Sequence, residues 1–228
     1  MSPHIPHYAA NDVRFVVTPF RRPRQRLTLV DAPPSRPAPA MEFFIARNGD
    51  DLEAAAALVR RCYGWRGYEF RPQVSAGGET TLLARCNGTL VGTLTVRCGV
   101  RQRLHAEHGF SEQIGELRQR GRRLVEYTRF AIDREVAGRP GRDTDLALEL
   151  IRRALLLGQV ALAATDCVIE VNPRHARYYQ REFGFRPCGT ERTCERVGAP
   201  ARLLHLNLDT PPDCVVNDAA GRPGPMFN

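Results

Sequence analysis

The stretch Arg122–Asp133, RRLVEYTRFAID, constrains the fold of this chain more than any other. Its β-branched, aromatic and aliphatic residues predict a strand, and apolar residues occupy both odd and even positions, as in a strand buried on both faces. Such a strand belongs in the middle of a sheet. Glu126 lies among these apolar residues, and a buried carboxylate must be paired, protonated or functional. Two hypotheses therefore stand for Glu126: an ion pair with a neighbouring Arg, or a catalytic role.

The composition indicates a soluble domain of ordinary size with short tails. The chain has 228 residues, of which 43% are hydrophobic and 25% are charged. All 33 basic residues are Arg, and the formal net charge of +8 suggests acidic partners. No basic stripe interleaved with aromatics and no helix-turn-helix signature is present, which argues against nucleic acid. No run of 18 apolar residues and no secretory signal is evident, so we expect a cytoplasmic protein without an integral membrane segment.

The cysteines do not predict a metal site. The sequence has seven of them, with no CxxC pair and no Cys beside a His at ligand spacing. In a cytoplasmic protein such scattered cysteines are expected to be reduced, and several of them to fill core positions. We therefore predict no metal.

Proline content suggests the domain boundaries. Residues 1–40 contain eight of the 17 prolines and predict a disordered tail, in which 13–17 and 27–30 alone have strand character. Residues 41–209 predict one folded domain. Residues 210–228 repeat the proline-rich pattern and are expected to form a second tail.

Between the tails, strand and helix patterns alternate. Strands are predicted at 41–47, 79–86, 89–98, 122–132, 167–171, 185–194 and 202–208, and helices at 51–62, 111–119, 144–163 and 173–182. Asn87-Gly88 predicts a two-residue hairpin. Asn48 or Asp50 is expected to cap the first helix, whose apolar face would contain Leu52, Ala55, Ala56 and Val59. This order predicts an α/β (α+β) fold with a mixed central sheet flanked by helices.

The element order resembles the GCN5-related N-acyltransferase fold. The resemblance implies that strands 122–132 and 167–171 splay apart and that an acyl-pantetheine arm lies in the gap. The piece from Asn172 through Tyr178-Tyr179 to Gly184-Phe185 resembles the family's closing signature, in which the Tyr lies near the leaving thiol. This sequence has one residue more than usual between Tyr179 and Gly184.

Closer resemblances narrow the family. Glu126-x-x-Arg129-Phe130-x-x-Asp133 resembles a strand of acyl-homoserine-lactone synthases. Three further pieces resemble long-chain N-acyl amino acid synthases of the N-acyl-tyrosine type, namely Arg61-Cys-Tyr63-x-x-Arg66-Gly67-Tyr68, Leu117-Arg118-x-x-Gly121-Arg122 and His175-x-x-Tyr178-Tyr179-x-x-x-Phe-Gly-Phe. The resemblance covers residues 41–208.

This resemblance implies catalytic roles for particular residues. N-acylation by a thioester requires removal of a proton from the ammonium group, stabilisation of an oxyanion and protonation of the thiolate. Glu126 is the expected base, directly or through water, because burial should raise its pKa towards neutrality. A backbone N–H between Phe130 and Ile132 is expected to hold the oxyanion. Tyr179 is the expected acid, with Tyr178 as the alternative.

Other residues are candidates for binding substrate. Arg129 is expected to pair in the neighbourhood of Glu126, to clamp an amino-acid carboxylate, or to be a surface Arg. Asn172 and His175 belong to the same signature, and His175 is as well suited to capping or packing as to catalysis. Three aromatic residues are expected to line a fatty-acyl tunnel. They are Tyr63, Trp65 and Tyr68.

The expected donor is an acyl-phosphopantetheine thioester, and no bound cofactor is predicted. Asp143 and Asp145, at the start of the long helix, would repel the pyrophosphate of coenzyme A. They favour acyl carrier protein, for which Arg97-Cys-Gly-Val-Arg101-Gln-Arg103 is a candidate docking patch. The expected reaction moves a long-chain fatty acyl group to the α-amine of a tyrosine-like or other amino acid. The alternatives are acyl-homoserine-lactone synthesis, acetyl-CoA-dependent acetylation, and an inactive acyl-binding or carrier-protein-binding module.

Overall fold

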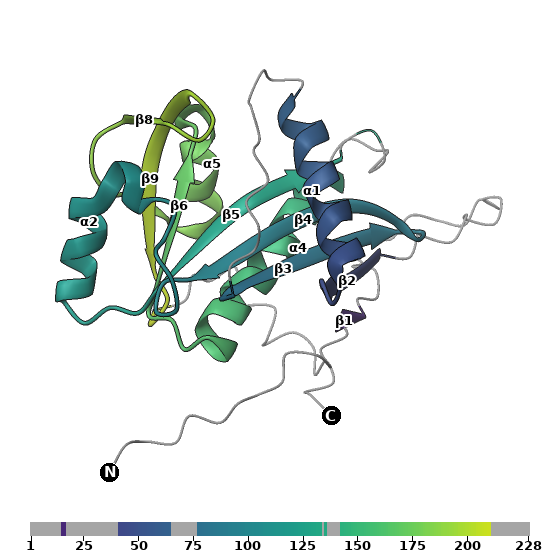
Figure 1. Ribbon diagram of the computed structural model, residues 1–228, viewed down its shortest axis with the longest axis horizontal. Coiled ribbons are helices and arrows are strands. Elements are labelled where there is room, and N and C mark those ends of the chain that lie inside the picture. Colours follow the sequence, from purple (N-terminus) through teal and green to yellow (C-terminus); the bar gives the residue numbers. More distant parts are fainter. Residues whose placement is uncertain (1–14, 17–40, 65–76, 134, 136–141, 211–228) are drawn as a thin grey trace, which may run out of the picture.

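The described parts of the chain form a mixed sheet with helices on both faces (Figure 1). The computed structural model describes residues 15–16, 41–64, 77–133, 135 and 142–210. The strand order is β1-β2-β3-β4-β5-β6-β9-β7, with β8 paired to β9, and the neighbours are antiparallel except for β5 and β6. The predicted fold class is confirmed. Within these ranges no helix combines the length and apolar character that a membrane span requires.

The elements follow the predicted order. The strands are β1 (Phe15–Val16), β2 (Met41–Ile45), β3 (Glu79–Cys86), β4 (Thr89–Cys98), β5 (Leu124–Ile132), β6 (Asp166–Val171), β7 (Arg186–Pro187), β8 (Arg192–Cys194) and β9 (Ala199–Asn207). The helices are α1 (Gly49–Gly64), α2 (Glu107–Gln119), α4 (Arg142–Leu156) and α5 (Pro173–Phe183), with a π-helical turn η1 (Leu157–Ala161) after α4.

One predicted strand differs from the structure, and the strand character predicted at 13–17 is confirmed for its two described residues. The single strand expected over 185–194 is wrong, because the chain forms the short strands β7 and β8 on either side of Gly189, whose φ of 92° interrupts the extended path. The described part of the expected N-terminal tail, 15–16, forms β1 and pairs antiparallel with β2 at the sheet edge. The possible strand at 27–30 lies outside the described residues.

Strand β5 occupies the centre of the sheet, as its sequence predicts. It pairs with β4 on one side and β6 on the other. Leu124 packs into a cluster beneath α2, whereas Val125 and Tyr127 belong to the large cluster that includes α4. Both faces of β5 are therefore covered.

The first helix and the hairpin show how local sequence sets local structure. Asn87 and Gly88 both have positive φ, 49° and 80°, as the predicted tight hairpin requires. Asn48 caps α1, because its Oδ1 accepts the N–H of Asp51 at 2.9 Å. The predicted apolar face of α1 is wrong at Leu52, which is 40% exposed. The buried face of α1 consists of Ala55, Leu58 and Val59, and Leu52 lies at the edge of this face.

Close packing of α4 against the sheet explains how this helix ends. A Cβ on Gly92 of β4 would lie 2.8 Å from Leu150 Cδ1, so a glycine there lets α4 approach the sheet. The hydroxyl of Tyr127 donates to the carbonyl of Ala154 at 2.8 Å. An inserted donor of this kind disturbs the i→i−4 ladder, and the regular α-helix gives way to η1 before the predicted end at 163.

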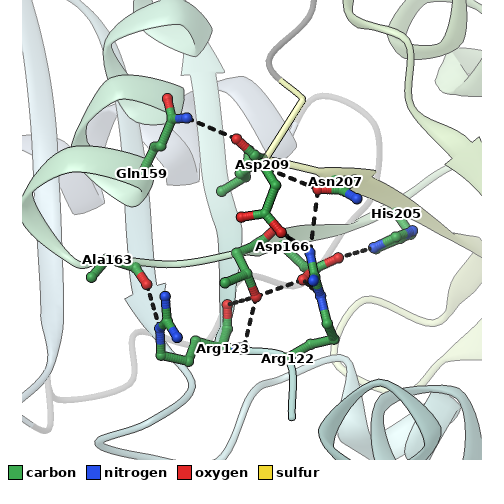
Figure 2. A network of polar contacts seen from close by, with 10 residues as sticks. Arg122, Arg123, Gln159, Ala163, Asp166, His205, Asn207 and Asp209 are labelled. Atoms are coloured by element: carbon green, nitrogen blue, oxygen red, sulfur yellow. Dashed lines mark hydrogen bonds and ion pairs between the residues drawn. The ribbon is translucent and has the colours of Figure 1, made fainter. Parts of the chain in front are cut away.

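A polar network joins the residues just before β5 and the start of β6 to the end of β9 (Figure 2). The buried carboxylate of Asp166 accepts hydrogen bonds from Arg122 and, at 2.7 Å, from Thr165, and it lies 2.6 Å from His205 Nε2. Arg122 also donates to Asp209 at 2.7 Å. Burial by itself raises the pKa of Asp166, but these hydrogen bonds outweigh it and lower the pKa. These hydrogen bonds stabilise the paired end of β5 and β6 and its contact with β9.

Candidate active site

Strands β5 and β6 separate at the centre of the sheet. They pair in parallel from Leu124 opposite Asp166 to Tyr127 opposite Ile169, and both strands then continue without further pairing to each other. On its other side β5 has a bulge, because Arg129 and Phe130 together lie opposite one residue of β4. Arg129 has a φ of 52°, a left-handed conformation that is uncommon outside glycine and bends the strand. The predicted splay of these two strands is confirmed.

The gap opens into a cavity of about 1620 Å³. Ligand pockets usually hold about 300–1,000 Å³, so this one is large enough for an elongated molecule. Its apolar half is formed by residues of β4, β5, α4, α5 and the start of the following loop: Leu94, Phe130, Ile132, Ile151, Tyr178, Tyr179 and Phe185. Its polar half is formed by residues just before and within α2, on β5 and β6, and in the turn between β8 and β9. These residues are His105, His108, Arg129, Glu170, Glu195 and Arg196.

Glu126 lies behind the cavity wall. Its side chain is 1% exposed, and its two oxygens accept the backbone N–H groups of His105 at 2.6 Å and Ala106 at 3.0 Å. His105 lines the cavity, whereas Glu126 is not among the lining residues. Burial raises the pKa of Glu126 from 4.5 to about 7, although the positive charge of Arg196 opposes the rise. Among the described residues no Arg forms a direct ion pair with Glu126, so that hypothesis is wrong.

Glu79, at the start of β3, is the centre of a charged cluster that sequence reasoning missed. Arg129 binds both of its carboxylate oxygens, at 2.9 and 3.0 Å. Arg97 donates to it at 2.6 Å, and His105 Nε2 lies 3.7 Å away. Burial by itself raises the pKa of Glu79, but the three neighbours outweigh it and lower the value from 4.5 to about 2. Arg97 is therefore part of a buried cluster, which removes it from the candidate docking patch.

Strand β5 places its predicted binding residues on the cavity. Phe130 and Ile132 line the apolar half, and their carbonyls accept hydrogen bonds from Tyr63 Oη at 3.2 Å and Cys62 Sγ at 3.4 Å. Tyr63 lines the cavity as well. Arg129 lines it too, with its two terminal nitrogens bound to Glu79, and contact with a substrate stays a prediction. Trp65 and Tyr68 lie outside the described residues.

Helix α5 brings four predicted residues to the cavity. Asn172, His175, Tyr178 and Tyr179 all line it. Asn172 caps α5, because its Oδ1 accepts the N–H of Arg174 at 3.2 Å. The ring of Tyr179 packs edge-on against Tyr178, with centroids 5.4 Å apart, and burial raises the pKa of its hydroxyl. The hydroxyl of Tyr179 is therefore protonated at neutral pH, and its role as an acid stays a prediction.

Arg196 and Glu170 were not found from the sequence, yet both lie in the polar half. Arg196 occupies the turn between β8 and β9, and its Nη2 donates to a carboxylate oxygen of Glu170 on β6. Burial by itself lowers the pKa of Arg196, but Glu170 outweighs it and raises the pKa, so the Arg stays charged. The chain between the two residues forms α5, β7 and β8, and no local pattern announces such a contact.

The arginines of two family-like motifs stabilise the fold around the site. Arg61, at the end of α1, donates to Asp133 at 2.6 Å. Arg118, in α2, donates at 2.7 Å to Glu107, which accepts the N–H of Leu104 and so holds the start of that helix. These contacts fix the elements that surround the cavity.

The splayed sheet and the cavity within it define an N-acyltransferase of the GCN5-related fold. The chain belongs to the family of N-acyl amino acid synthases described as FeeM, whose family model matches residues 54–207. A search of curated proteins found no match.

Solved structures show the same fold. The structure of FeeM, an N-acyl amino acid synthase from uncultured soil microbes, is 22% identical in sequence, with a TM-score of 0.70 over 75% of this chain and 92% of that chain. The acyl-homoserine-lactone synthase LasI is 15% identical, with a TM-score of 0.56 over 79% of this chain and 96% of that chain. An acyl-CoA N-acyltransferase from Pseudomonas aeruginosa is 16% identical, with a TM-score of 0.53 over 73% of this chain and 98% of that chain.

Proposed function

We propose that this synthase transfers a long-chain fatty acyl group from acyl carrier protein to the α-amine of an amino acid, tyrosine-like or other. The main support for the proposal is the cavity at the splay, whose lining contains both apolar and charged residues. A fatty acyl chain suits the first and a charged amino acid suits the second. The reacting carbonyl then lies between the two halves, beside the unpaired part of β5.

The proposed chemistry begins with a proton transfer. Glu126 accepts a proton from the acceptor's ammonium group through a water molecule, because its carboxylate does not line the cavity. A pKa of about 7 suits a base that works near neutral pH. The free amine nitrogen then attacks the thioester carbonyl carbon, and a C–N bond forms.

The tetrahedral intermediate collapses in the second half of the reaction. A backbone N–H between Phe130 and Ile132 stabilises its oxyanion. The C–S bond breaks, the amide nitrogen loses its extra proton to solvent, and Tyr179 gives its hydroxyl proton to the leaving thiolate. Tyr179 then regains a proton from solvent and Glu126 releases its proton to solvent, which returns both residues to their starting states. Tyr178, whose ring adjoins that of Tyr179, is the alternative acid.

Two features support a carrier protein as the donor. The sequence has Asp143 and Asp145 near the start of the long helix, and acidic residues at such a position disfavour the pyrophosphate of coenzyme A. Acyl carrier proteins are acidic, and the net charge of +8 suits an acidic partner. A cytoplasmic location, as expected from the sequence, is part of the proposal.

Lipid extraction followed by mass spectrometry tests the proposal. Cells that overproduce the full chain should accumulate N-acyl amino acids, and the purified protein should form them faster from acyl carrier protein than from acyl-CoA. Glu126→Gln should abolish product formation, whereas Glu112→Gln, on the exposed face of α2, should not. Acyl lactones or short acetylated amines instead would contradict the proposal. Unchanged product from a folded Glu126→Gln variant would remove Glu126 from the mechanism.

A further inference from the structure

We infer that Arg196 and Glu170 together recognise the zwitterionic end of a free α-amino acid. The acceptor's carboxylate binds the guanidinium of Arg196, and its ammonium group faces the carboxylate of Glu170. This inference rests on the proposed function and adds the two residues by which the site distinguishes a free amino acid from an amine or an amino-acid amide.

Among the described residues, three arginines line the cavity and are candidates to bind a carboxylate. Arg61 is bound to Asp133, and its side chain is 59% exposed, where water weakens an ionic contact. Arg129 has both terminal nitrogens engaged by Glu79. Arg196 donates from Nη2 alone to Glu170. A guanidinium has five N–H donors, so Arg196 retains donors for a second carboxylate.

Glu170 is placed to meet the ammonium group. It follows Ile169, the last residue of β6 that pairs with β5, so it stands at the point where the gap begins. Its side chain is 7% exposed and lines the cavity. Residues 169 and 171 point to the opposite face of the strand, as alternation requires, and Ile169 belongs to the large apolar cluster. Glu170 therefore brings a negative charge to the polar half directly beside the reacting centre.

The charge of the polar half also favours a zwitterion. Among the buried groups, Arg97 and Arg129 share one carboxylate, that of Glu79, which leaves one positive charge in excess. Glu195 also lines the polar half, but it is exposed, and water screens its charge. Arg196 and Glu170 cancel each other. An amine without a carboxylate would add a further positive charge to a desolvated region, whereas a zwitterion adds no net charge.

The acceptor series on the wild-type enzyme tests the inference without any mutation. The full chain, supplied with acyl carrier protein carrying a long-chain acyl group, is given L-tyrosine, L-tyrosinamide or tyramine, and in parallel L-leucine, L-leucinamide or isopentylamine. The expected kcat/KM for the better amino acid exceeds that of its amide and its amine by roughly 100-fold, as expected for loss of a buried charged hydrogen bond. Equal rates for all three members of a series would overturn the inference.

Variants assign the effect to the named residues. Arg196→Gln should lower kcat/KM for the amino acid by roughly 100-fold and leave the amide and the amine within about threefold. Arg196→Lys, which keeps the charge but lacks the planar fork, should fall between. Arg192→Gln, an exposed arginine on the same hairpin, is the matched control and should change nothing.

The outcomes separate the inference from the proposed function. If Arg196→Gln slows the amino acid, amide and amine equally, the carboxylate does not bind there and the inference is wrong. If the wild-type enzyme acylates none of the six acceptors and the lipid extracts contain no N-acyl amino acid, the proposed function fails and the inference fails with it. If Arg196→Gln does not fold, Arg196→Lys is compared with wild type on the same three acceptors, and an equal slowing of all three overturns the inference.

Discussion

Replacing Glu79 with Gln should destabilise the protein strongly. The carboxylate of Glu79 is 1% exposed and neutralises two arginines whose side chains are themselves only 13% and 18% exposed. Glutamine has nearly the same shape but no charge. Its side chain has one acceptor oxygen, whereas the arginine N–H groups bind two oxygens of Glu79. Removing one partner from a buried ion pair costs about 3–5 kcal/mol. We expect the free energy of unfolding at pH 7 to fall by about that amount.

The pKa of Glu79 gives an independent magnitude. Its value falls from 4.5 to about 2 on folding, and each tenfold change in proton affinity is worth about 1.4 kcal/mol, so the ionised carboxylate stabilises the fold by roughly 3 kcal/mol. Because the folded-state pKa is the lower one, this stabilisation is complete above pH 4.5 and is lost as the pH falls towards 2. The variant should lack this part of the acid sensitivity.

Urea unfolding followed by circular dichroism between pH 2.5 and 8 measures both effects. Glu53→Gln is the control, because Glu53 pairs with Arg60 at 2.6 Å on the surface and such pairs contribute about 0–1 kcal/mol. The reasoning is refuted if Glu79→Gln unfolds within 1 kcal/mol of wild type at pH 7 and keeps the same slope below pH 4.5. Such a result would mean that solvation by water, and not the ion pair with Glu79, stabilises the charges of the two arginines.

Three further predictions concern rate and packing. The acyl-transfer rate of the wild-type enzyme should rise as the pH increases through about 7, because Glu126 accepts a proton only when ionised; a rate that is flat between pH 6 and 8 would contradict this. Tyr179→Phe should reduce kcat by roughly 100-fold or more in single-turnover assays, because the leaving thiolate loses its proton donor; an unchanged kcat would assign that role elsewhere. Gly92→Ala should lower the free energy of unfolding by about 1–3 kcal/mol, because the new Cβ would lie 2.8 Å from Leu150 Cδ1. Thermal unfolding measures this change. The control Gly115→Ala in α2, where a new Cβ has no atom within 4 Å, should be neutral or stabilising.

Local sequence determined most of the elements and their order. The Asn87-Gly88 turn, the apolar character of β5, and Asn172-Pro173 at the start of α5 each predict the structure that forms there, because hairpin geometry, burial on both faces and helix capping depend on neighbouring residues. The family-like motifs also predicted the splay between β5 and β6, and several residues that line the cavity. Whether Glu126, Tyr179 and the other site residues act as expected stays a prediction.

Only the tertiary structure decided which charged groups meet. The hairpin by itself pairs Glu79 with Val96, but a bulge at Ala84/Arg85 shifts the register by one residue and brings Arg97 opposite Glu79. The bulge at Arg129 then turns this side chain towards the same carboxylate. Bulges depend on how strands pack against helices, and a shift of one residue changes every side-chain partner.

The contact between Arg196 and Glu170 has the same origin. Both residues look like ordinary surface charges in the sequence, and 25 residues separate them. They meet because β9 pairs with β6 and because β8 folds back onto β9, which carries the turn of Arg196 to the mouth of the gap. The sequence by itself therefore determined the sheet, its central strand and the class of enzyme. The charges that surround the reacting centre depend on long-range strand pairing, which no local pattern records.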